Sequence, residues 1–388
     1  RYWRDWSSDV CSSDLWQDYQ RHDTKQPEKA LEFLQRIEGE VEGFSREDAR
    51  VFVTGSGGSG IGKHIGAKFV QEVNAVSLAV EKLYPRCGSV IELGGQDAKI
   101  IIFKEDPETG RKKKIPSMND KCAGGTGAVI DKINAKLRIP SDELCNMGYK
   151  GLKLHPVAGK CGVFAETDIN GLQKSGVPAD ELMASLFEAI VMQNLSVLTR
   201  GNTLRPEVLL LGGPNCYIKG MQDCWKTNIP KIWAERNTPL PEGENPEDLI
   251  KIPSNAQYFA ALGAVEFGKD EDAHVGRYAG TGKLEWYINV GRDEEKKKKG
   301  GNGGLAKNGE ELSAFKDKYR HQQFVPETFY PGQVVEGFIG IDGGSTSTKA
   351  VLISKDKERR ILAKAYQLSK GRSEERRVGK ECRSRWSP

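Results

Sequence analysis

Two cysteines, Cys122 and Cys161, each come just before a stretch whose apolar spacing predicts a helix. The dipole and free amides of a helix N-terminus favour the thiolate, which is the form that binds metal. The two positions lie far apart in sequence and neither belongs to a Cys-x-x-Cys pair, so they do not predict a zinc site within one chain. Two chains around a two-fold axis can instead supply the four thiolates of an iron–sulfur cluster. Taken alone, the pattern also fits two buried core cysteines.

The segment Ile91–Lys99 (IELGGQDAK) predicts a hairpin that can bind phosphate. Its glycines, Gly94 and Gly95, let backbone amides approach an anion closely. Beside them, Asp97 can hold Mg²⁺ through water and Gln96 can orient an attacking water. Hydrolysis of a phosphoanhydride needs little more than such positioning. An ordinary polar turn is the alternative.

A second hairpin of this kind is expected in the segment GIDGGSTSTK at 340–349, whose combination of residues is more specific than that of 91–99. An apolar strand ends in an aspartate, two glycines and a hydroxyl cluster follow, and another strand returns. Hydroxyls and backbone amides at such a turn can wrap a β- or γ-phosphate. The candidate residues are Asp342, Gly343, Gly344, Ser345, Thr346, Thr348 and Lys349.

Two other glycine-rich segments carry less specific signals. In LLLGGP, a buried strand ends at Gly212 and Gly213, where a purine ring can lie against the backbone. The segment GGSGIGK at 57–63 matches part of a phosphate-binding P-loop, but His64 stands where that motif needs a Ser or Thr for Mg²⁺. We therefore expect a flexible strand-to-helix loop there.

Strands and helices alternate from Val51 to Gly268, which predicts an α/β fold. Strands are expected at 51–53, 90–93, 98–103 and 208–211, and the second and third form a hairpin. Residues 104–114 are expected to form a solvated turn. Helices are expected at 24–45, 70–83, 127–137, 142–147, 163–174, 180–200 and 257–267. Another hairpin, built from 338–342 and 351–354, begins a second unit.

The composition is typical of a globular protein that lives in water: 37% of the 388 residues are hydrophobic and 29% are charged. The net charge of +4 is too small to predict a nucleic-acid partner. No apolar run approaches the ~20 residues that span a bilayer, and we expect neither a signal peptide nor a membrane partner. Eight cysteines without a dense framework do not predict a secreted disulfide scaffold, so a cytoplasmic protein is expected.

The chain divides unevenly. Residues 1–15 and 372–388 match no secondary-structure period and resemble translated sequencing-adapter DNA, so we exclude both from the fold. Residues 269–335 contain a charged run and the sequence GGNGG, which predict a linker with room for one local helix. On either side of it, 16–268 form a first unit and 336–371 begin a second.

Together, the two hairpins and the Gly-Gly turn resemble the nucleotide site of the acetate/sugar kinase–Hsp70–actin superfamily, which has a ribonuclease H-like fold. The motifs MNDKCAGGTGAVID (118–131) and GKCGVFAETDI (159–169) further resemble the activators of 2-hydroxyacyl-CoA dehydratase. These belong to the BadF/BadG/BcrA/BcrD-type ATPases, which also include the ATPase subunits of benzoyl-CoA reductase. The resemblance runs from about Val51 to Gly268 and is specific at both cysteine motifs.

This resemblance implies an ATPase that passes a low-potential electron to a 2-hydroxyacyl-CoA dehydratase. In that family a homodimer holds one [4Fe–4S] cluster through two cysteines per subunit, which would be Cys122 and Cys161 here. ATP binding and hydrolysis change the angle between the two helices that approach the cluster. The implied ligands are ATP or ADP with Mg²⁺, and the implied electron donor is reduced ferredoxin or flavodoxin.

The same resemblance implies roles for individual residues. Asp97 and Gln96 would act in hydrolysis, within a phosphate segment that includes Gly94 and Gly95. Two further groups are implied to lie near the nucleotide: Gly125, Thr126 and Gly127 at the phosphates, and Gly212 and Gly213 at the adenosine.

The chain departs from the family pattern because the first phosphate hairpin should precede residues 51–268, whereas 340–349 follow the linker. The simplest account is a fragment of a large double-activase protein. Residues 16–268 would be most of copy one, without its first phosphate hairpin, and 336–371 the start of copy two. The two copies could pair with each other in place of a homodimer. A circular permutation that places 340–349 against 94–97 is an alternative.

Two other functions fit part of the pattern. A small-molecule kinase of the same superfamily, such as a sugar kinase, would need a carboxylate base beside the γ-phosphate and no cluster. A non-catalytic fragment with an incomplete ATP site would bind a partner only.

Overall fold

A five-stranded mixed sheet forms the centre of residues 1–296, the first of two units into which the chain divides. Strands β3 (Ser89–Leu93), β4 (Ala98–Glu105) and β5 (Lys112–Asn119) form an antiparallel meander. On the other side of β3, β6 (Val208–Leu211) and then β7 (Ile250–Lys251) are added in parallel. The order β5-β4-β3-β6-β7 fits the expected α/β, ribonuclease H-like class.

The computed structural model describes residues 15–105, 112–119, 124–159, 161–298, 306, 308–320, 324–344 and 347–368. The adapter-like segments 1–15 and 372–388 therefore lie outside the described residues, except for Leu15. Their interpretation stays a prediction.

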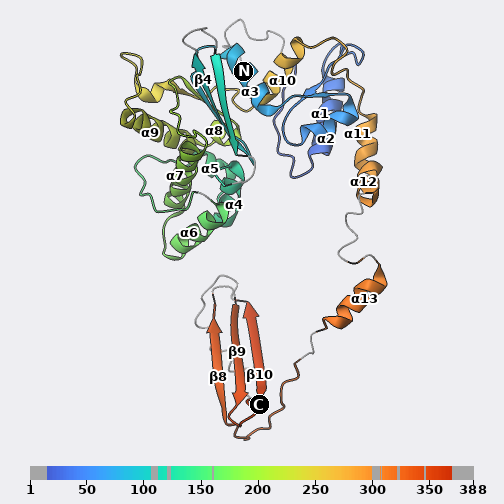
Figure 1. The fold of residues 1–388 in the computed structure, drawn as a ribbon, viewed down its shortest axis with the longest axis vertical. Helices are drawn as coiled ribbons and strands as arrows, with labels where there is room; N and C mark the ends of the chain where they lie inside the picture. The colour runs from blue at the N-terminus through green and yellow to red at the C-terminus, as the bar shows by residue number, and fades with distance from the viewer. Residues whose placement is uncertain are drawn as a thin grey trace. The chain divides into compact units, whose positions relative to one another are not determined.

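Both faces of the central sheet are covered by helices, because side chains alternate from one face to the other along each strand. In β4, Ile100 and Ile102 pack into one core cluster, whereas Ile101 and Phe103 pack into another. The first cluster is completed by α4 (Gly127–Leu137), α6 (Gly162–Lys174), α7 (Ala179–Val197) and α9 (Lys219–Glu235). The second is completed by α3 (Glu72–Leu83) and α10 (Phe259–Lys269) (Figure 1).

The remaining helices are short or lie outside these two layers. None of the helices in the described ranges is both long and apolar enough to cross a membrane. Their bounds are α1 (Gln26–Glu40), α2 (Gly58–Ile65), α5 (Ser141–Asn146), α8 (Gly213–Tyr217), η1 (Pro246–Leu249), α11 (Gly282–Trp286), η2 (Tyr287–Gly291), α12 (Arg292–Lys298) and α13 (Gly309–Lys318).

A second, two-stranded sheet lies before the central one in sequence. Its parallel strands are β1 (Phe52–Val53) and β2 (Lys68–Phe69). The glycine-rich segment between them was expected to be a loop, but most of it forms α2. Gly62 is buried there, and a methyl group on it would lie 3.1 Å from a side-chain carbon of Val53, so glycine permits the close approach of helix and strand.

The first part of the expected linker belongs to the first unit, so the linker begins later than predicted. The Arg50 guanidinium donates to the carbonyl of Val275 over 2.9 Å. The Tyr278 hydroxyl donates to Glu38 over 2.7 Å, and Leu284 of α11 is fully buried beside α1 and α2. The chain divides only after Lys296. The sequence was misleading because the apolar residues in this segment are sparse.

The second unit contains a three-stranded antiparallel sheet with the order β10-β9-β8. Strands β8 (Gly337–Gly343) and β9 (Ser347–Ser354) form the expected hairpin, and β10 (Ile361–Leu368) adds a third strand that was not predicted. Every residue of β8 is exposed, including Phe338, Ile339 and Ile341. This sheet therefore has an apolar strand that the described residues leave uncovered.

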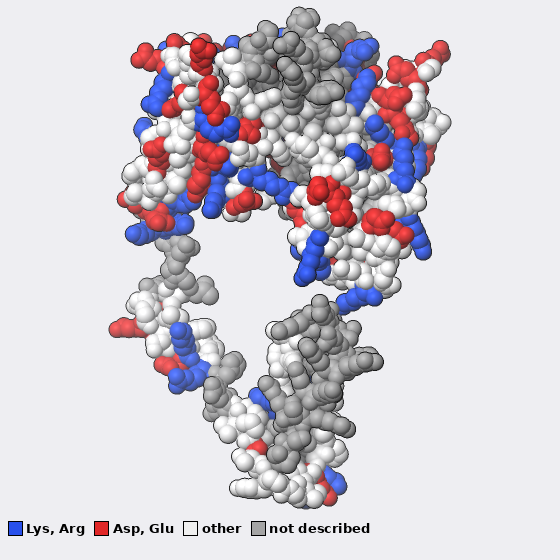
Figure 2. Space-filling view, turned by 180° about the vertical axis from the view of Figure 1, so that it is seen from behind, with Lys and Arg blue, Asp and Glu red and all other residues white. Residues whose placement is uncertain are grey.

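The surface of the first unit mixes the two signs of charge. Figure 2 shows acidic and basic side chains interspersed on the face in view. Several oppositely charged side chains of the first unit form ion pairs. Lys150 lies 2.8 Å from Glu247, and Lys251 lies 2.6 Å from Glu207. Exposed pairs of this kind contribute only about 0–1 kcal/mol each, so the two core clusters provide most of the stability.

Gly263 sets how closely α10 approaches α3. A methyl group on Gly263 would lie 1.6 Å from the backbone carbonyl oxygen of Ala75, and both residues are buried. We expect Gly263→Ala to lower the free energy of unfolding by at least about 2 kcal/mol, because the two helices would have to separate. Denaturant unfolding followed by circular dichroism measures the change.

Gly171→Ala is the matched control for this substitution. Gly171 lies on the exposed side of α6, with no atom within 4 Å of an added methyl group. Alanine there should raise stability by about 0.5–1 kcal/mol, since it lowers the entropy cost of forming the helix. Similar unfolding curves for the two variants would contradict the close packing of α3 on α10.

Candidate functional site

The predicted phosphate hairpin joins β3 to β4 at residues 94–97. The amide of Gly94 donates to the carbonyl of Asp97 over 2.9 Å, which closes the turn. A methyl group on Gly94 would lie 2.3 Å from an Asp97 carboxylate oxygen, so a side chain there would displace that carboxylate. Gly95 and Gln96 are exposed at its tip, where Gln96 can reach a ligand in solvent.

Lys99, one of the largest fully buried side chains, lies directly behind this turn on β4 and is surrounded by carboxylates. Its ammonium nitrogen lies 3.1 Å from Asp97, 3.1 Å from Glu92 and 3.3 Å from Glu72. Three carboxylates thus face one buried cation. The sequence analysis did not single out Glu72, Glu92 or Lys99 as site residues, although a lysine within the buried run 98–103 is a signal that could have been used.

Burial raises the pKa of Glu72 to about 7, and the opposing effect of Lys99 is smaller. Burial also raises the pKa of Glu92, again against the effect of Lys99. Burial alone would lower the pKa of Lys99, but the carboxylates of Glu92, Asp97 and Glu72 raise it, so the ammonium stays charged. The cluster can therefore hold an additional proton on its acidic side near neutral pH.

The start of α4 is bonded to the turn. The amide of Gly127 donates to the carbonyl of Gly94 over 2.9 Å, and the amide of Ala128 donates to the carbonyl of Gly95 over 2.7 Å. A side chain on Gly127 would lie 3.0 Å from the Gly94 oxygen, so the approach is close. The hairpin and the first turn of α4 consequently form one piece, as expected if Gly125–Gly127 lie near the phosphates.

The Gly-Gly turn after β6 lies at the same edge of the sheet. Gly212 has φ +87°, and a methyl group on it would lie 2.2 Å from the carbonyl oxygen of Leu93. Because β3 and β6 are parallel and adjacent, their carboxyl ends bring the two glycine turns together. Ligands of open α/β sheets commonly bind at such an edge.

Aromatic side chains gather beside this turn. The Tyr19 hydroxyl would lie 2.7 Å from a methyl group on Gly213. The ring centroid of Tyr19 lies 5.8 Å from that of Tyr217 and 6.5 Å from that of Tyr258. Burial raises the pKa of Tyr19. None of these tyrosines was predicted as a site residue.

Cys161 occupies the N-cap position of α6, as the sequence predicted. The backbone amides of Phe164 and Val163, at the start of α6, favour the thiolate and lower the pKa of this thiol. This is the arrangement that favours a thiolate. Cys122 lies outside the described residues, so its distance from Cys161 is not described.

The first turns of α4 and α6 lie side by side. A methyl group on Gly162 would lie 2.8 Å from a side-chain carbon of Val129. Glu166 of α6 pairs with Lys132 at 2.6 Å and with Lys136 at 3.2 Å, and both lysines belong to α4. Cys161 is thereby held close to the helix that begins five residues after Cys122.

The other cysteines in the described ranges are also free thiols. Burial raises the pKa of Cys87 to about 12 and also raises those of Cys216 and Cys224. Within the described part of the chain, no group of three or more His, Cys, Asp and Glu side chains is placed to hold a metal.

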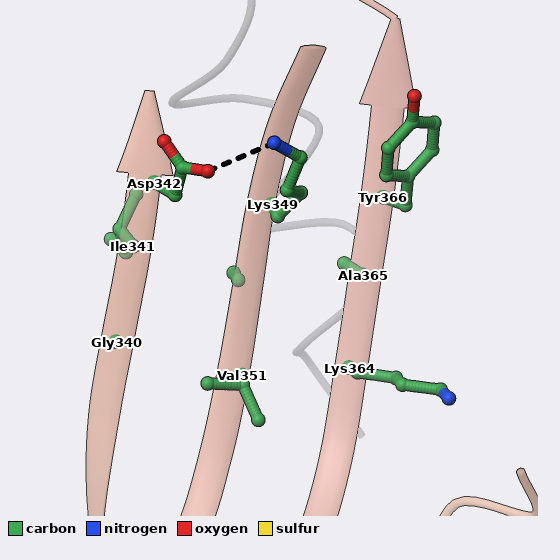
Figure 3. A pocket seen from close by; sticks show the side chains of 9 residues that line it. Gly340, Ile341, Asp342, Lys349, Val351, Lys364, Ala365 and Tyr366 are labelled. Carbon is green, nitrogen blue, oxygen red and sulfur yellow. Dashed lines mark hydrogen bonds and ion pairs between the residues drawn. The ribbon is translucent and has the colours of Figure 1, made fainter. Parts of the chain in front are cut away.

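The second predicted phosphate hairpin lies in the second unit, between β8 and β9. Asp342 and Lys349 are cross-strand partners, and their side chains form an ion pair of 2.9 Å (Figure 3). A groove of about 680 Å³ runs beside them along the three strands, past Tyr366. Gly343, Gly344 and Thr348 surround the turn, whereas Ser345 and Thr346 lie outside the described residues.

Comparison with known proteins identifies relatives of the first unit. Residues 16–239 match the model of the BadF/BadG/BcrA/BcrD ATPase family. The (R)-2-hydroxyglutaryl-CoA dehydratase activating ATPase of Acidaminococcus fermentans is 27% identical over 222 residues, which are 57% of this chain and 76% of that protein. The activator of lactoyl-CoA dehydratase of Anaerotignum propionicum is 29% identical over 177 residues, 45% of this chain and 65% of that protein.

A solved structure has a related fold. The activator of the 2-hydroxyisocaproyl-CoA dehydratase from Clostridium difficile, with bound ADPNP, has a TM-score of 0.50 and 25% sequence identity. The match covers 64% of this chain and 82% of that one. The expected fold class and the family resemblance are confirmed.

The buried carboxylates give a pH dependence that can be measured. The pKa of Glu72 in the folded protein, about 7, lies above its ordinary value of 4.5, so the folded protein holds a proton that the unfolded chain releases between these pH values. The contribution of Glu72 to the free energy of unfolding should therefore fall as the pH rises from about 4.5 to about 7.

Glu72→Gln should remove this decrease in the free energy of unfolding between pH 4.5 and 7. Glu47→Gln, at an exposed position, should leave the decrease unchanged. Urea unfolding between pH 4.5 and 7.5 measures the effect. Parallel stability curves for Glu72→Gln and the parent protein would show that Glu72 is not the group responsible.

In iron-free protein, the thiol of Cys161 should react faster than the thiols of Cys87 and Cys224. The pKa of Cys161 is lowered, whereas those of Cys87 and Cys224 are raised, so Cys161 has the larger thiolate fraction at pH 7. Cys87 and Cys224 are in addition buried, whereas Cys161 is partly exposed. We expect iodoacetamide to modify Cys161 at least about tenfold faster than either of them, as judged by mass spectrometry of peptides. Equal rates for Cys161 and the partly exposed Cys145 across pH 6–9 would argue against a stabilised thiolate.

Proposed function

Since the chain belongs to the BadF/BadG/BcrA/BcrD ATPase family, we propose that it is part of an ATP-driven electron donor to a 2-hydroxyacyl-CoA dehydratase or a benzoyl-CoA reductase-type partner. The observation that carries this proposal is the pair of hydrogen bonds between the phosphate hairpin and the start of α4. Through them, the nucleotide site is bonded directly to the helix that follows Cys122.

ATP or ADP, with Mg²⁺, would bind at the edge where the glycine turns meet. Gly95 and Gln96 are exposed, so their backbone amides and the Gln96 side chain would bind the phosphates and orient an attacking water. Asp97, held in place by Lys99, would position the water shell of Mg²⁺. The adenosine would lie against Gly212 and Gly213, beside the tyrosine cluster.

Cys161 and Cys122 would provide two of the four thiolates of a [4Fe–4S] cluster, and a second protomer or the second copy would provide the others. The lowered pKa of Cys161 fits this role, since a metal ligand must be deprotonated. When bound, such a cluster carries one electron at low potential. The amides of Val163 and Phe164, which favour the Cys161 thiolate, would help to set that potential.

The coupling between the two sites would be mechanical. A nucleotide shifts a protein between two arrangements only as far as it binds one of them better. When ATP replaces ADP, the contacts between the phosphates and the hairpin would change and the hairpin would move. Gly127 and Ala128 would move with it, because their amides are hydrogen-bonded to Gly94 and Gly95. The angle of α4 relative to α6 would change as a result.

The partners follow from the family resemblance. The relatives named above are activators of dehydratases, which supports a dehydratase-type electron acceptor. Reduced ferredoxin or flavodoxin would supply the electron, in the cytoplasm. We propose no membrane or nucleic-acid partner.

The second unit would be the start of a second ATPase domain, at residues 336–371. Its strand order, β10-β9-β8, repeats the antiparallel meander β5-β4-β3 of the first unit. In the first unit β3 also pairs with β6, whereas among the described residues β8 pairs only with β9. Its uncovered strand is what a domain of this class would show without its later strands and helices.

Anaerobic purification of the chain tests the cluster. We expect brown protein with about two iron atoms per chain, because one four-iron cluster would be shared by two protomers. Cys122→Ser and Cys161→Ser should each lose at least about 80% of the iron, while Cys145→Ser should keep it. Colourless, iron-free protein that still hydrolyses ATP would remove the cluster from the proposal.

The same preparations test the nucleotide site. Calorimetric titration with ATP and Mg²⁺ would detect binding, and Asp97→Asn should weaken the Mg²⁺-dependent part at least about tenfold. Chain that retains iron but binds no nucleotide would instead support the alternative of an incomplete ATP site.

A further inference from the structure

Helix α7 supports the segment that leads into Cys161. His155 contacts it twice: the imidazole Nε2 lies 2.7 Å from a carboxylate oxygen, and the backbone amide donates to a hydroxyl over 2.9 Å. A methyl group on Gly159 would lie only 2.7 Å from an α7 carbonyl oxygen. The residues of α7 that make these contacts, or pack beside them, recur every fourth position along one side: Glu181, Ser185, Ala189 and Gln193.

The next residue of α7, Asn194, reaches the start of α4. Its side chain is 1% exposed, and its Nδ2 donates to the carbonyl of Gly125 over 2.8 Å and to the carbonyl of Ile190 over 2.9 Å. Gly125 has φ +78°, a conformation that favours glycine. The bond to Gly125 crosses 69 residues of sequence, so it is a tertiary contact and not a local feature of the helix.

Gln193 lies between the two segments. A methyl group on Gly125 would lie 3.4 Å from its Cγ, and one on Gly159 would lie 3.4 Å from both its Cβ and its Oε1. The oxygen is buried and accepts no hydrogen bond from the residues that the structure describes. One turn of α7 thus touches the start of α4 and the approach to α6 at once.

We propose that Asn194 is a positioning residue that holds the start of α4 in a fixed relation to the start of α6. The proposal rests on the function proposed for Cys161 and the α4–α6 pair, but the contact itself does not depend on a bound cluster.

Asn194 also determines how α4 can move. The phosphate hairpin is bonded to Gly127 and Ala128, whereas Asn194 is bonded two residues earlier, at Gly125. A displacement of the hairpin therefore rotates α4 about Gly125, because that carbonyl is fixed. Without the Asn194 bond, the same displacement would pull the segment along and leave the angle between the helices less changed.

Two variants of the full chain test the proposal. Asn194→Leu removes the hydrogen-bond donor but keeps a side chain of similar size. In Asn194→Ser, the hydroxyl can still donate to the carbonyl of Ile190, four residues earlier, as the Ser185 hydroxyl donates to Glu181, but it cannot reach Gly125. We expect both to speed amide hydrogen exchange in residues 124–130 at least about fivefold in iron-free protein, since a buried carbonyl loses its partner. Both should also lose iron to a chelator faster after anaerobic reconstitution.

Asn228→Leu is the matched control. Asn228 is a 4% exposed helix asparagine that also donates to the carbonyl four residues earlier, but its other partners, which include Tyr149 and Glu188, do not belong to α4. It should leave exchange in residues 124–130 within about twofold of the parent, whatever its effect on overall stability. The electron paramagnetic resonance spectrum of the reduced protein should change for the Asn194 variants and stay the same for this control.

Unchanged exchange in residues 124–130 for both Asn194 variants would overturn the proposal. Equal acceleration by Asn228→Leu would do the same, because it would indicate a general loss of stability. If the parent chain binds no iron, the cluster in the proposed function fails, while hydrogen exchange still decides the role of Asn194.

Discussion

The arrangement of the candidate site depends on two hydrogen bonds between α4 and the turn that joins β3 to β4. They run from the amides of Gly127 and Ala128 to the carbonyls of Gly94 and Gly95. The first amides of a helix have no partner within the helix. Here the turn between β3 and β4 provides two acceptors, and Gly127 allows the backbones to meet closely, since a methyl group on it would lie 3.0 Å from the Gly94 oxygen. The turn and α4 are therefore fixed to each other, and every other site element is positioned relative to this pair.

Behind that turn, charge links segments that are remote in sequence. Lys99 holds Glu72 of α3, Glu92 of β3 and Asp97 of the turn around one ammonium group. Such a cluster is costly to bury, and removal of one charged partner is strongly destabilising. It therefore favours a single position of α3 relative to the β3–β4 hairpin. Burial raises the pKa values of Glu72 and Glu92 because the loss of solvation disfavours their charged forms by more than the Lys99 ammonium favours them.

Much of this could be predicted from the sequence because the signals were local. The helix at 127–137 and the strand at 208–211 have the predicted bounds, and Gly-Gly turns marked the hairpins. The turn predicted at 104–114 wrongly included the first residues of β5, because these are lysines, which are common on exposed edge strands. The Lys99 cluster and the bond from Asn194 to Gly125 were missed because each joins segments distant in sequence.

The packing of α10 on α3 has a consequence for synthesis of the chain. The face of the sheet that these helices cover includes Val90, Ile101 and Leu209, all made well before α10. On the ribosome, the part of this apolar surface that α10 covers stays open until residue 269 has emerged. Contacts of such long sequence separation form slowly, and the nascent chain is prone to aggregate during that interval. Chaperone capture should therefore concentrate on chains shorter than this length.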